Sequence, residues 1–426
     1  MQIKVVWICA FSNPKVREHF TTKINPILRF ILKKKGHPVN TSVDYGIWNS
    51  NAIKEFEKIK DIDLHIISPI RYLSKKEVRF DVNGIHYYFF RDENSNLISQ
   101  LYYQLVTKNK SLFIKNRKHV RTLVKEINPE IVHVIGAENP YYSLALLDIP
   151  DKIPTIIQLQ ALLDRLVDNI ANQFEKKNIA YKGRLERQII DKADYVGTEV
   201  VDFKEYIKEE IKPETKFLDI SIAMGNEINL TEDVKVYDFV YFAAGINENK
   251  AGDVALKSFA IAHQLHPEIT LNIIGKIDED FRKILDEIIS KNRLENAVFI
   301  EGKLPTHNDV ISQIRKSKYA LLPLKYDFVP NTIREAMCNG LPVVTTITEN
   351  GTTKLNEKRE SVLLSEQGDH NAIAKNMIKL IENPSLAETL RNNAVITEQE
   401  RTNNYDMMLK WADAYNKIIE SRQYAY

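Results

Sequence analysis

Short apolar runs alternate along this chain with longer amphipathic stretches, and this alternation limits the folds that the chain can adopt. The apolar runs have the length of β-strands, and the stretches between many of them have the spacing of amphipathic helices. Strands that alternate with helices form parallel sheets built from βαβ units. We therefore expect an α/β protein with parallel sheets.

The expected elements fall into two series. The strands of the first series are Ile3–Phe11, Leu64–Pro69, Ile85–Phe90, Ile131–Ile135, Thr155–Leu159 and Tyr195–Thr198. The strands of the second series are Phe239–Ala243, Thr270–Ile274, Val298–Glu301, Tyr319–Leu324, Val343–Ile347 and Val362–Leu364. Helices are expected over Leu97–Ile127, Arg184–Lys192, Val254–His266, Phe281–Asn292, Asp309–Lys316, Ala372–Glu382 and Tyr405–Arg422.

A polar segment, GNEINLTEDVKV at residues 225–236, separates the two series, and neither periodicity continues through it. A chain of 426 residues is also longer than one typical domain. We expect two doubly wound domains, over residues 1–230 and 231–404, and a final helix over 405–426 that packs on either of them. Open parallel sheets bind ligands beyond the C-terminal ends of their strands, so a cleft between the domains is the expected site.

The composition excludes several broad classes of protein. The 59 basic and 57 acidic residues give a net charge of +2, which does not indicate a nucleic-acid binder. The two cysteines fit a reducing compartment rather than a disulfide framework. The N-terminal MQIKVVWICAF is typical of a first strand rather than a signal peptide, and no run approaches the ~20 apolar residues of a membrane span. We expect a cytoplasmic protein.

The segment DFVPNTIREAMCNGLPVVTT, at residues 327–346, carries the clearest chemical signal. Asp327 and Glu335 stand in it with seven residues between them, and a Pro-Asn-Thr turn after Asp327 opens a short helix. A helix N-terminus directs free backbone N–H groups and a positive dipole end at one point. Such a point suits a phosphate, and a nearby carboxylate suits a sugar hydroxyl.

A purely structural role for this segment is the main alternative. Thr332 and Glu335 have the T-x-x-E spacing of a capping box, and Gly340 is placed to end the helix in a left-handed conformation. However, the segment follows an apolar strand, Tyr319–Leu324, and therefore lies at the C-terminal end of that strand. A capping box would use Glu335 only, so it does not explain the presence of Asp327. These two points favour a binding site.

This segment resembles the signature of family 4 of the retaining glycosyltransferases. The resemblance rests on the two acids, on the Pro-Asn before the helix and on the sequence EAMCNGLPVV. The resemblance covers most of residues 195–400 and extends more weakly to WICAFSN, IVHVIGAENPYYS and PTIIQLQALLD in the first half. It implies a GT-B fold, with two Rossmann-like domains that face a central cleft. The implied activity is transfer of a sugar from a nucleotide-sugar to a saccharide acceptor, in the manner of bacterial cell-surface polysaccharide biosynthesis.

The resemblance assigns donor-binding roles to the second half. Glu335 would bind the ribose hydroxyls, and Asp327, where glutamate is usual, would reach the hydroxyls of the transferred sugar. Backbone amides around Pro330, Asn331 and Thr332 would meet the sugar and the diphosphate.

Three strand-end loops of the second half add to this donor site. The family clamps the diphosphate with a glycine-arginine pair and a lysine, for which this chain offers Gly245 and Lys250. Ile246 stands where the arginine is usual, so a bidentate donor to the diphosphate is missing. The loops at Gly275 and at Lys303-Leu304 would lie near the nucleotide. A purely structural interpretation is the alternative. In it, Lys250 is a solvent-exposed loop lysine, and the glycines of the other loops are ordinary residues at strand ends.

The first half would then hold the acceptor. Candidate residues after its strands are Ser12 and Asn13, then Glu138, Asn139 and Tyr141, and finally Gln160, where relatives often carry histidine. Carboxylate, amide and aromatic groups are suited to sugar hydroxyls and C–H faces. Asn139 followed by Pro140 also fits a helix N-terminus, with Asn139 as its cap. Glu138 and Asp327 are the two candidate catalytic residues.

No metal or other cofactor is expected. Asp61-Ile62-Asp63 is expected to precede its strand, Asp278-Glu279-Asp280 to start a helix, and no His/Cys cluster is evident along the sequence. Residues 108–125 carry seven lysines and arginines without an acid. This segment is interpreted as a solvated helix, or else as a patch for anionic lipid heads that would fit a lipid-linked acceptor at the inner membrane face.

Two other functions stay open at this point. A GT-B protein can act on nucleotide-sugars as a 2-epimerase, which would keep the nucleotide contacts and need acids that shuttle protons. A non-catalytic relative that only binds nucleotide-sugars is the second alternative, and the missing arginine is its best support.

Overall fold

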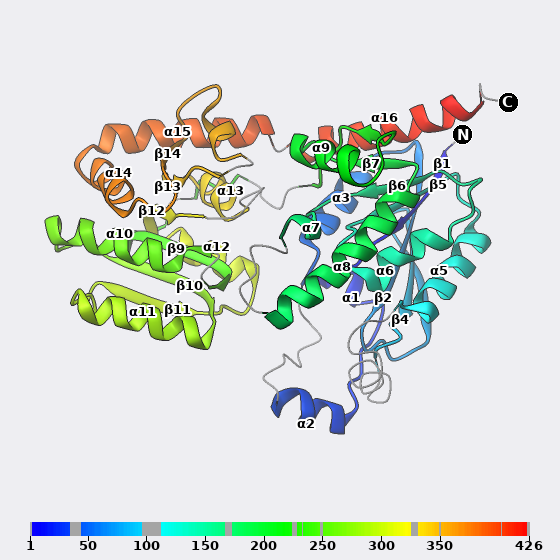
Figure 1. Cartoon of the computed structure of the whole chain (residues 1–426), viewed down its shortest axis with the longest axis horizontal. Helices are drawn as coiled ribbons and strands as arrows, with labels where there is room; N and C mark the ends of the chain where they lie inside the picture. The colour runs from blue at the N-terminus through cyan, green and yellow to red at the C-terminus, as the bar shows by residue number, and fades with distance from the viewer. Residues whose placement is uncertain are drawn as a thin grey trace. The chain divides into compact units, whose positions relative to one another are not determined.

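The computed structural model describes residues 2–34, 44–95, 112–166, 173–223, 228–231, 233–247, 250–324, 331–348, 351–401 and 403–423. The chain forms two compact units, which are described separately below (Figure 1). Unit 1 consists of Met1–Met224 together with Asn404–Tyr426, and unit 2 consists of Gly225–Asn403. The C-terminal helix therefore belongs to the same unit as the first strand.

Unit 1 is built on an eight-stranded sheet with the order β3-β4-β2-β1-β5-β6-β7-β8. Its strands are β1 Ile3–Ile8, β2 Ile62–Ile70, β3 Glu77–Val82, β4 Ile85–Arg91, β5 Ile131–Ile135, β6 Thr155–Gln158, β7 Tyr195–Gly197 and β8 Lys216–Leu218. All neighbouring strands are parallel except β3, which forms an antiparallel hairpin with β4. The carboxyl ends of β1, β5 and β6 therefore lie side by side at one edge of the sheet.

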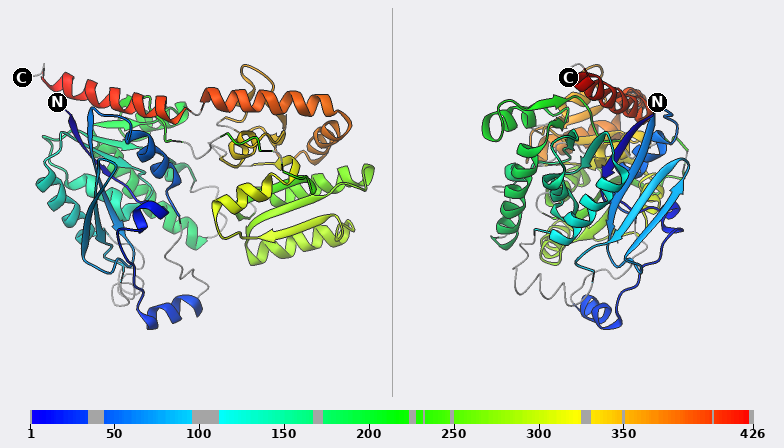
Figure 2. Two further views of the ribbon diagram at one scale, coloured as in Figure 1. Left: turned by 180° about the vertical axis from the view of Figure 1, so that it is seen from behind. Right: turned by 90° about the vertical axis from the view of Figure 1, so that its right-hand side faces the viewer.

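Helices surround this sheet. They are α1 Pro14–Arg17, α2 Pro26–Lys34, α3 Ile47–Phe56, α5 Ile114–Ile127, α6 Pro140–Ser143, the 3₁₀ helix η1 Leu144–Asp148, α7 Leu163–Leu166, α8 Gln173–Lys192, α9 Val201–Glu210 and α16 Asn404–Gln423. Figure 2 shows α16, in red, running along unit 1 when the molecule is seen from behind. Its contact with α3 places it within the unit 1 core.

Aromatic side chains join α16 to the central strands of unit 1. Trp7, Trp411 and Tyr415 are almost fully buried, and Trp7 Nε1 donates a hydrogen bond of 2.9 Å to the Tyr415 hydroxyl. The same hydroxyl lies 2.7 Å from Nδ1 of His133 on β5, and burial lowers the pKa of His133 to about 3. His133 is therefore a neutral core residue rather than a site residue.

Unit 2 contains a fully parallel six-stranded sheet with the order β11-β10-β9-β12-β13-β14. Its strands are β9 Tyr237–Ile246, β10 Leu271–Ile277, β11 Val298–Gly302, β12 Ser317–Leu322, β13 Val343–Thr346 and β14 Val362–Ser365. Its helices are α10 Gly252–Leu265, α11 Glu279–Lys291, α12 His307–Ile314, α13 Asn331–Cys338, the 3₁₀ helix η4 Thr353–Asn356, α14 His370–Glu382 and α15 Pro384–Arg401.

A buried ion pair fixes α13 against α15 in unit 2. Nε of Arg334 donates to Oε2 of Glu398 at 3.0 Å, and both side chains are almost completely inaccessible to solvent. Two charges this deeply buried are tolerated only when they are paired. The pair therefore holds α13, the helix that carries Glu335, in a defined position on the sheet.

The expectation of an α/β protein with two parallel sheets is confirmed, and the differences are local. β3 and β8 are not among the expected strands. Of the helix expected over Leu97–Ile127, only the part after residue 111 is described, and it forms α5. Cys9 and Cys338 are both buried, and neither forms a disulfide bond within the described residues. Within the part of the chain that the structure describes, no helix is long and apolar enough to cross a membrane.

Candidate functional site

Four strand ends of unit 2 converge at one edge of its sheet. Because β11, β10, β9 and β12 are neighbours and parallel, their carboxyl ends lie side by side there. Gly275 at this edge has a φ of +145°, and a Cβ at its position would lie 2.0 Å from the carbonyl oxygen of Ala243. Only glycine therefore allows β10 to approach β9 this closely where the two strands end.

Glu335 is the best defined candidate group at this edge. It lies on α13, one turn after the helix begins at Asn331, and only 15% of its side chain is exposed. Burial raises the pKa of Glu335 to about 7. Oε1 of Glu335 lies 3.8 Å from Nε2 of His307, the first residue of α12, and burial lowers the pKa of His307. The sequence interpretation missed His307 because it comes from a different βα unit.

Thr332 does not act as the helix cap that its spacing with Glu335 suggests. The helix begins at Asn331, which places Thr332 within its first turn rather than before it. Asn331 is exposed and Thr332 is half-buried. Asp327 and Pro330 lie outside the described residues, so their expected roles stay predictions.

A pocket of about 350 Å³ lies at the ends of β10 and β11. Its lining contains the expected residues Gly275 and Lys303, and it also contains Lys276 and Arg282. Arg282 lies in α11, whose first residue directly follows the loop after β10, and its Nε donates to Asp286 at 2.7 Å. Leu304 packs against the unit 2 core instead of lining this pocket. Arg282 supplies a cation that the sequence interpretation missed.

The loop between β9 and α10 carries Lys250. The hydroxyl of Tyr241 donates to the carbonyl oxygen of Lys250 at 2.6 Å, and the backbone N–H of Lys250 lies 3.1 Å from the carbonyl oxygen of Asn247. These contacts hold the backbone of the loop, and the Lys250 side chain is half-buried. Among the described residues other than its chain neighbours, none has a heavy atom within 4 Å of the position that a Cβ would take at Gly245.

Unit 1 brings three of its expected residues together at the ends of β5 and β6. Asn139 Nδ2 donates to Oε1 of Glu138 at 2.8 Å. With its amide oriented to satisfy both neighbours, Gln160 donates to the same Oε1 at 3.2 Å and accepts from Trp48 Nε1 at 2.8 Å. Asn139 does stand at the N-cap of α6, but its side chain makes no capping bond. Its amide donates a hydrogen bond to Glu138 instead.

The Glu138 carboxyl is held in a tight, largely dry position. Gly136 has a φ of +95°, and a Cβ there would lie 2.8 Å from Oε1 of Glu138. Burial raises the pKa of Glu138 to about 7, and its buried Oε2 has no hydrogen-bond partner within the part of the chain that the structure describes. A carboxyl with this pKa can exist in either protonation state near neutral pH, which suits acid–base chemistry.

A second buried carboxyl, Glu186 on α8, affects this part of unit 1. It is 1% exposed, accepts a hydrogen bond from the backbone N–H of Leu163 at 2.8 Å, and burial raises its pKa to about 8. The charge of Glu138 raises the pKa of Glu186 further. The sequence interpretation missed Glu186 because helix periodicity gives no sign that this acid faces inward.

The remaining acceptor candidates have structural partners. Asn13 caps α1 by accepting from the backbone N–H of Val16 at 3.0 Å, and Ser12 accepts from Arg17 at 3.0 Å. Tyr141 packs edge-on against Tyr142, and burial raises its pKa above the usual range. Ser12 and Asn13 therefore shape the loop after β1, and Glu138 is the stronger candidate for chemistry.

Comparison with known proteins agrees with this reading of unit 2. Residues 231–396, which include Glu335, Lys250 and the pocket, match the family model described as glycosyl transferases group 1. An uncharacterized glycosyltransferase from Haemophilus influenzae is 29% identical over 137 residues. That match covers 32% of this chain and only 37% of the relative, so the chain matches little more than a third of that protein's length.

Solved structures extend the comparison to both units. Sucrose-phosphate synthase from Thermosynechococcus elongatus aligns over 99% of this chain and 100% of its own, at 13% identity and a TM-score of 0.65. HepE from Anabaena, solved with UDP and glucose, aligns over 98% of this chain and 100% of its own, at 14% identity and a TM-score of 0.61. The fold is therefore the GT-B fold of glycosyltransferases.

Proposed function

We propose that this protein is a retaining glycosyltransferase that moves a hexose from a nucleoside-diphosphate donor to a saccharide hydroxyl. The observation that carries the proposal is the position of Glu335. It stands on a helix that follows a central parallel strand, is mostly buried, and lies within the segment that matches the group 1 glycosyltransferases. Such a carboxyl suits the paired hydroxyls of a donor ribose.

The diphosphate of the donor needs positive charge, and unit 2 offers it from two loops and from helix α11. Lys250 follows β9, while Arg282 and Lys303 line the pocket after β10 and β11. The chain has Ile246 where relatives carry an arginine, and Arg282 is a candidate replacement for that charge. Fixed cations and backbone N–H groups can stabilise the leaving diphosphate without a metal ion.

The transfer step would proceed as follows. The acceptor hydroxyl oxygen forms a bond to the anomeric carbon while the bond from that carbon to the diphosphate oxygen breaks. The proton of the hydroxyl passes to an oxygen of the leaving diphosphate. Asp327 would orient the transferred sugar. Glu138, with Asn139 and Gln160 around it, would bind hydroxyls on the acceptor side.

The nature of the donor and acceptor is also part of this proposal. HepE was solved with UDP and glucose, so a UDP-hexose is the first donor to test.

A lipid-linked acceptor at the cytoplasmic membrane face would fit a role in cell-surface polysaccharide synthesis. In the described part of 108–125, Lys115, Lys118, Arg121 and Lys125 of α5 are exposed, whereas Arg117 is paired with Asp148 at 2.7 Å.

One experiment tests the proposed activity. The protein is incubated with a panel of nucleotide-sugars, with and without acceptor saccharides, and the released nucleoside diphosphate is quantified by chromatography. We expect release that depends on the acceptor, and NMR of the product should show the donor's anomeric configuration. Tight binding without release for every donor and acceptor would instead indicate a non-catalytic binding protein.

A 2-epimerase is the second candidate, because one observation favours it. Glu138 and Glu186 both have pKa values near neutrality and influence each other electrostatically, as two proton-shuttling acids would. Proton NMR of the nucleotide-sugar after incubation without acceptor distinguishes the two activities. A second nucleotide-sugar in the spectrum would support the epimerase, and an unchanged spectrum would exclude epimerisation of that donor.

A further inference from the structure

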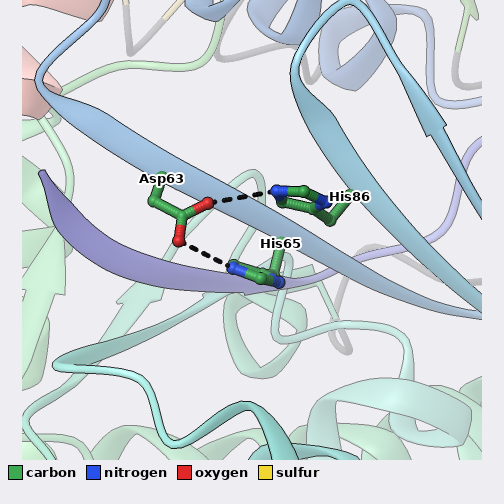
Figure 3. Close-up of side chains that lie close together, drawn as sticks. All are labelled: Asp63, His65 and His86. Atoms are coloured by element: carbon green, nitrogen blue, oxygen red, sulfur yellow. Dashed lines mark ion pairs between the residues drawn. The ribbon is translucent and has the colours of Figure 1, made fainter.

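Two histidines and an aspartate lie side by side on the unit 1 sheet, apart from the loops described above (Figure 3). Asp63 and His65 stand two residues apart on β2 and therefore point to the same face of the sheet. His86 on β4 is the direct partner of His65 across the two parallel strands. All three are near the amino ends of their strands, the opposite end from the loops that carry Glu138 and Gln160.

The two imidazole rings approach the two oxygens of one carboxylate (Figure 3). Nε2 of His65 lies 3.2 Å from Oδ2 of Asp63, and Nε2 of His86 lies 3.3 Å from Oδ1 of the same carboxylate. The two imidazole rings are stacked, with centroids 4.6 Å apart. In a tetrahedral zinc site with bonds of about 2.0–2.1 Å, ligand atoms are about 3.3 Å apart, and each imidazole nitrogen lies at such a distance from one of the two Asp63 oxygens. One ligand atom from each of the three residues lies within 4.8 Å of the other two.

Each histidine is oriented by a second contact through its other nitrogen. Nδ1 of His86 lies 2.7 Å from Oδ1 of Asp81, and Nδ1 of His65 lies 3.2 Å from the hydroxyl of Tyr88. Asp81 accepts a hydrogen bond, so Nδ1 of His86 carries the proton and Nε2 presents a lone pair when the ring is neutral. A carboxylate–histidine pair of this kind is the usual support for a metal-bound imidazole.

His65 is the buried member of this cluster. It is 7% exposed, and among the described residues its Nε2 has no hydrogen bond of good geometry, although Oδ2 of Asp63 lies 3.2 Å away. Lys4 on β1 is in register with Asp63, and its Nζ donates to the carbonyl oxygen of Ile127 at 3.5 Å. In the tautomer that leaves a lone pair on Nε2 of His65, this lone pair faces the Asp63 carboxylate, and a cation between the two groups would stabilise them.

We propose that Asp63, His65 and His86 bind a divalent transition-metal ion, with Zn²⁺ as the best match to the ligand set. Two imidazoles and one carboxylate provide three ligands, and the half-exposed sides of Asp63 and His86 leave room for water as the fourth. The ion joins β2 to the edge hairpin β3–β4, so it stabilises this edge of unit 1. It is separate from sugar transfer, and the expectation that transfer needs no metal is unaffected.

Metal binding by the full-length protein tests the proposal directly. Protein treated with a chelator and then desalted is titrated with Zn²⁺ against a chromophoric competitor, and Co²⁺ is used to record visible absorption bands. We expect one ion per chain, a tetrahedral Co²⁺ spectrum and a higher melting temperature with Zn²⁺. Asp63→Asn and His86→Gln should abolish this binding, and Asp81→Asn, which removes only the supporting contact, should weaken it about 10- to 100-fold.

His119→Gln provides the matched control. His119 also pairs with a carboxylate, Glu77, at 2.7 Å, but it is not part of the three-residue cluster. This variant should bind Zn²⁺ like the wild type, and circular dichroism should show that all variants remain folded. Failure of the folded wild type to bind Zn²⁺, or equal binding by Asp63→Asn, would overturn the proposal and leave the cluster as an ordinary imidazole–carboxylate network.

Discussion

Oε1 of Glu335 lies 3.8 Å from Nε2 of His307, and burial moves the pKa values of the two groups in opposite directions. The pKa of Glu335 rises to about 7, whereas that of His307 falls below its usual value. Near neutral pH, His307 is therefore neutral and Glu335 is close to half-ionised. The binding strength of this site should depend on pH through Glu335.

Donor binding should strengthen as pH rises through about 7. The ionised carboxylate accepts hydrogen bonds from two hydroxyls, while the protonated form, which dominates below pH 7, accepts them poorly. We expect UDP affinity to rise between pH 6 and pH 8 and then level off. Calorimetric titration of UDP across this range checks the prediction, and the dependence should be lost in Glu335→Gln. An affinity that falls with increasing pH would contradict it.

Lys250→Met should weaken transfer by about 10- to 150-fold. A charge-assisted contact to a phosphate contributes about 1.5–3 kcal/mol, and methionine keeps the chain length without the charge. Steady-state kinetics with the active donor provide the measurement. Lys257→Met is the control, since Lys257 on α10 is exposed and pairs with Asp253 at 3.1 Å within the same helix. An equal loss in both variants would remove the special role of Lys250.

Glu398→Gln should destabilise unit 2 by about 3–5 kcal/mol. The substitution leaves the charge of the buried Arg334 without its partner, and breaking one half of a buried ion pair typically costs this much. Urea denaturation followed by circular dichroism gives the free energy of unfolding. Glu388→Gln on the same helix is the control, because Glu388 is exposed and lies 3.9 Å from Arg391. A change below about 1 kcal/mol in Glu398→Gln would show that Arg334 is otherwise satisfied.

Unit 1 should lose stability as pH rises from about 5 to 8. The folded chain keeps Glu138 and Glu186 protonated up to about pH 7 and 8, whereas the unfolded chain releases both protons near pH 4.5. Because the folded state then binds more protons, stability falls with pH, by at most about 1.4 kcal/mol per pH unit for each group.

Unfolding curves at several pH values measure this dependence. Glu186→Gln should flatten the slope, and Glu205→Gln, at an exposed position of α9, should not. A slope that is equally steep in Glu186→Gln would contradict the assignment of a raised pKa to this residue.

Much of the fold follows from local sequence, and the exceptions have clear causes. Strands such as β5 and β6 are buried on both faces, so they are continuous apolar runs that are easy to recognise. β3 was not predicted because it is an edge strand with charged residues, and β8 has only three residues. The strand that holds Asp63 begins at Ile62 rather than Leu64, which places this acid inside the sheet.

The site could be predicted only where its residues lie in one sequence segment. Glu335 was found because the helix, the turn and the following strand are contiguous in sequence. His307, Arg282 and Glu186 were missed because each becomes significant only when separate elements come together. The same applies to Asp63, His65 and His86, whose proximity depends on the register between β2 and β4.

The central claim is that Glu335 binds the nucleotide part of the donor, and UDP titration at pH 8 tests it most directly. Calorimetry compares the wild-type protein with two variants, Glu335→Gln and Glu287→Gln. Glu287 is an exposed acid on α11, so its replacement by glutamine makes the same chemical change away from the site. We expect Glu335→Gln to bind UDP about 10- to 150-fold more weakly, since about 1.5–3 kcal/mol of hydrogen bonding is lost. Glu287→Gln should bind like the wild type, and equal UDP affinity in all three proteins would show that Glu335 does not bind the nucleotide.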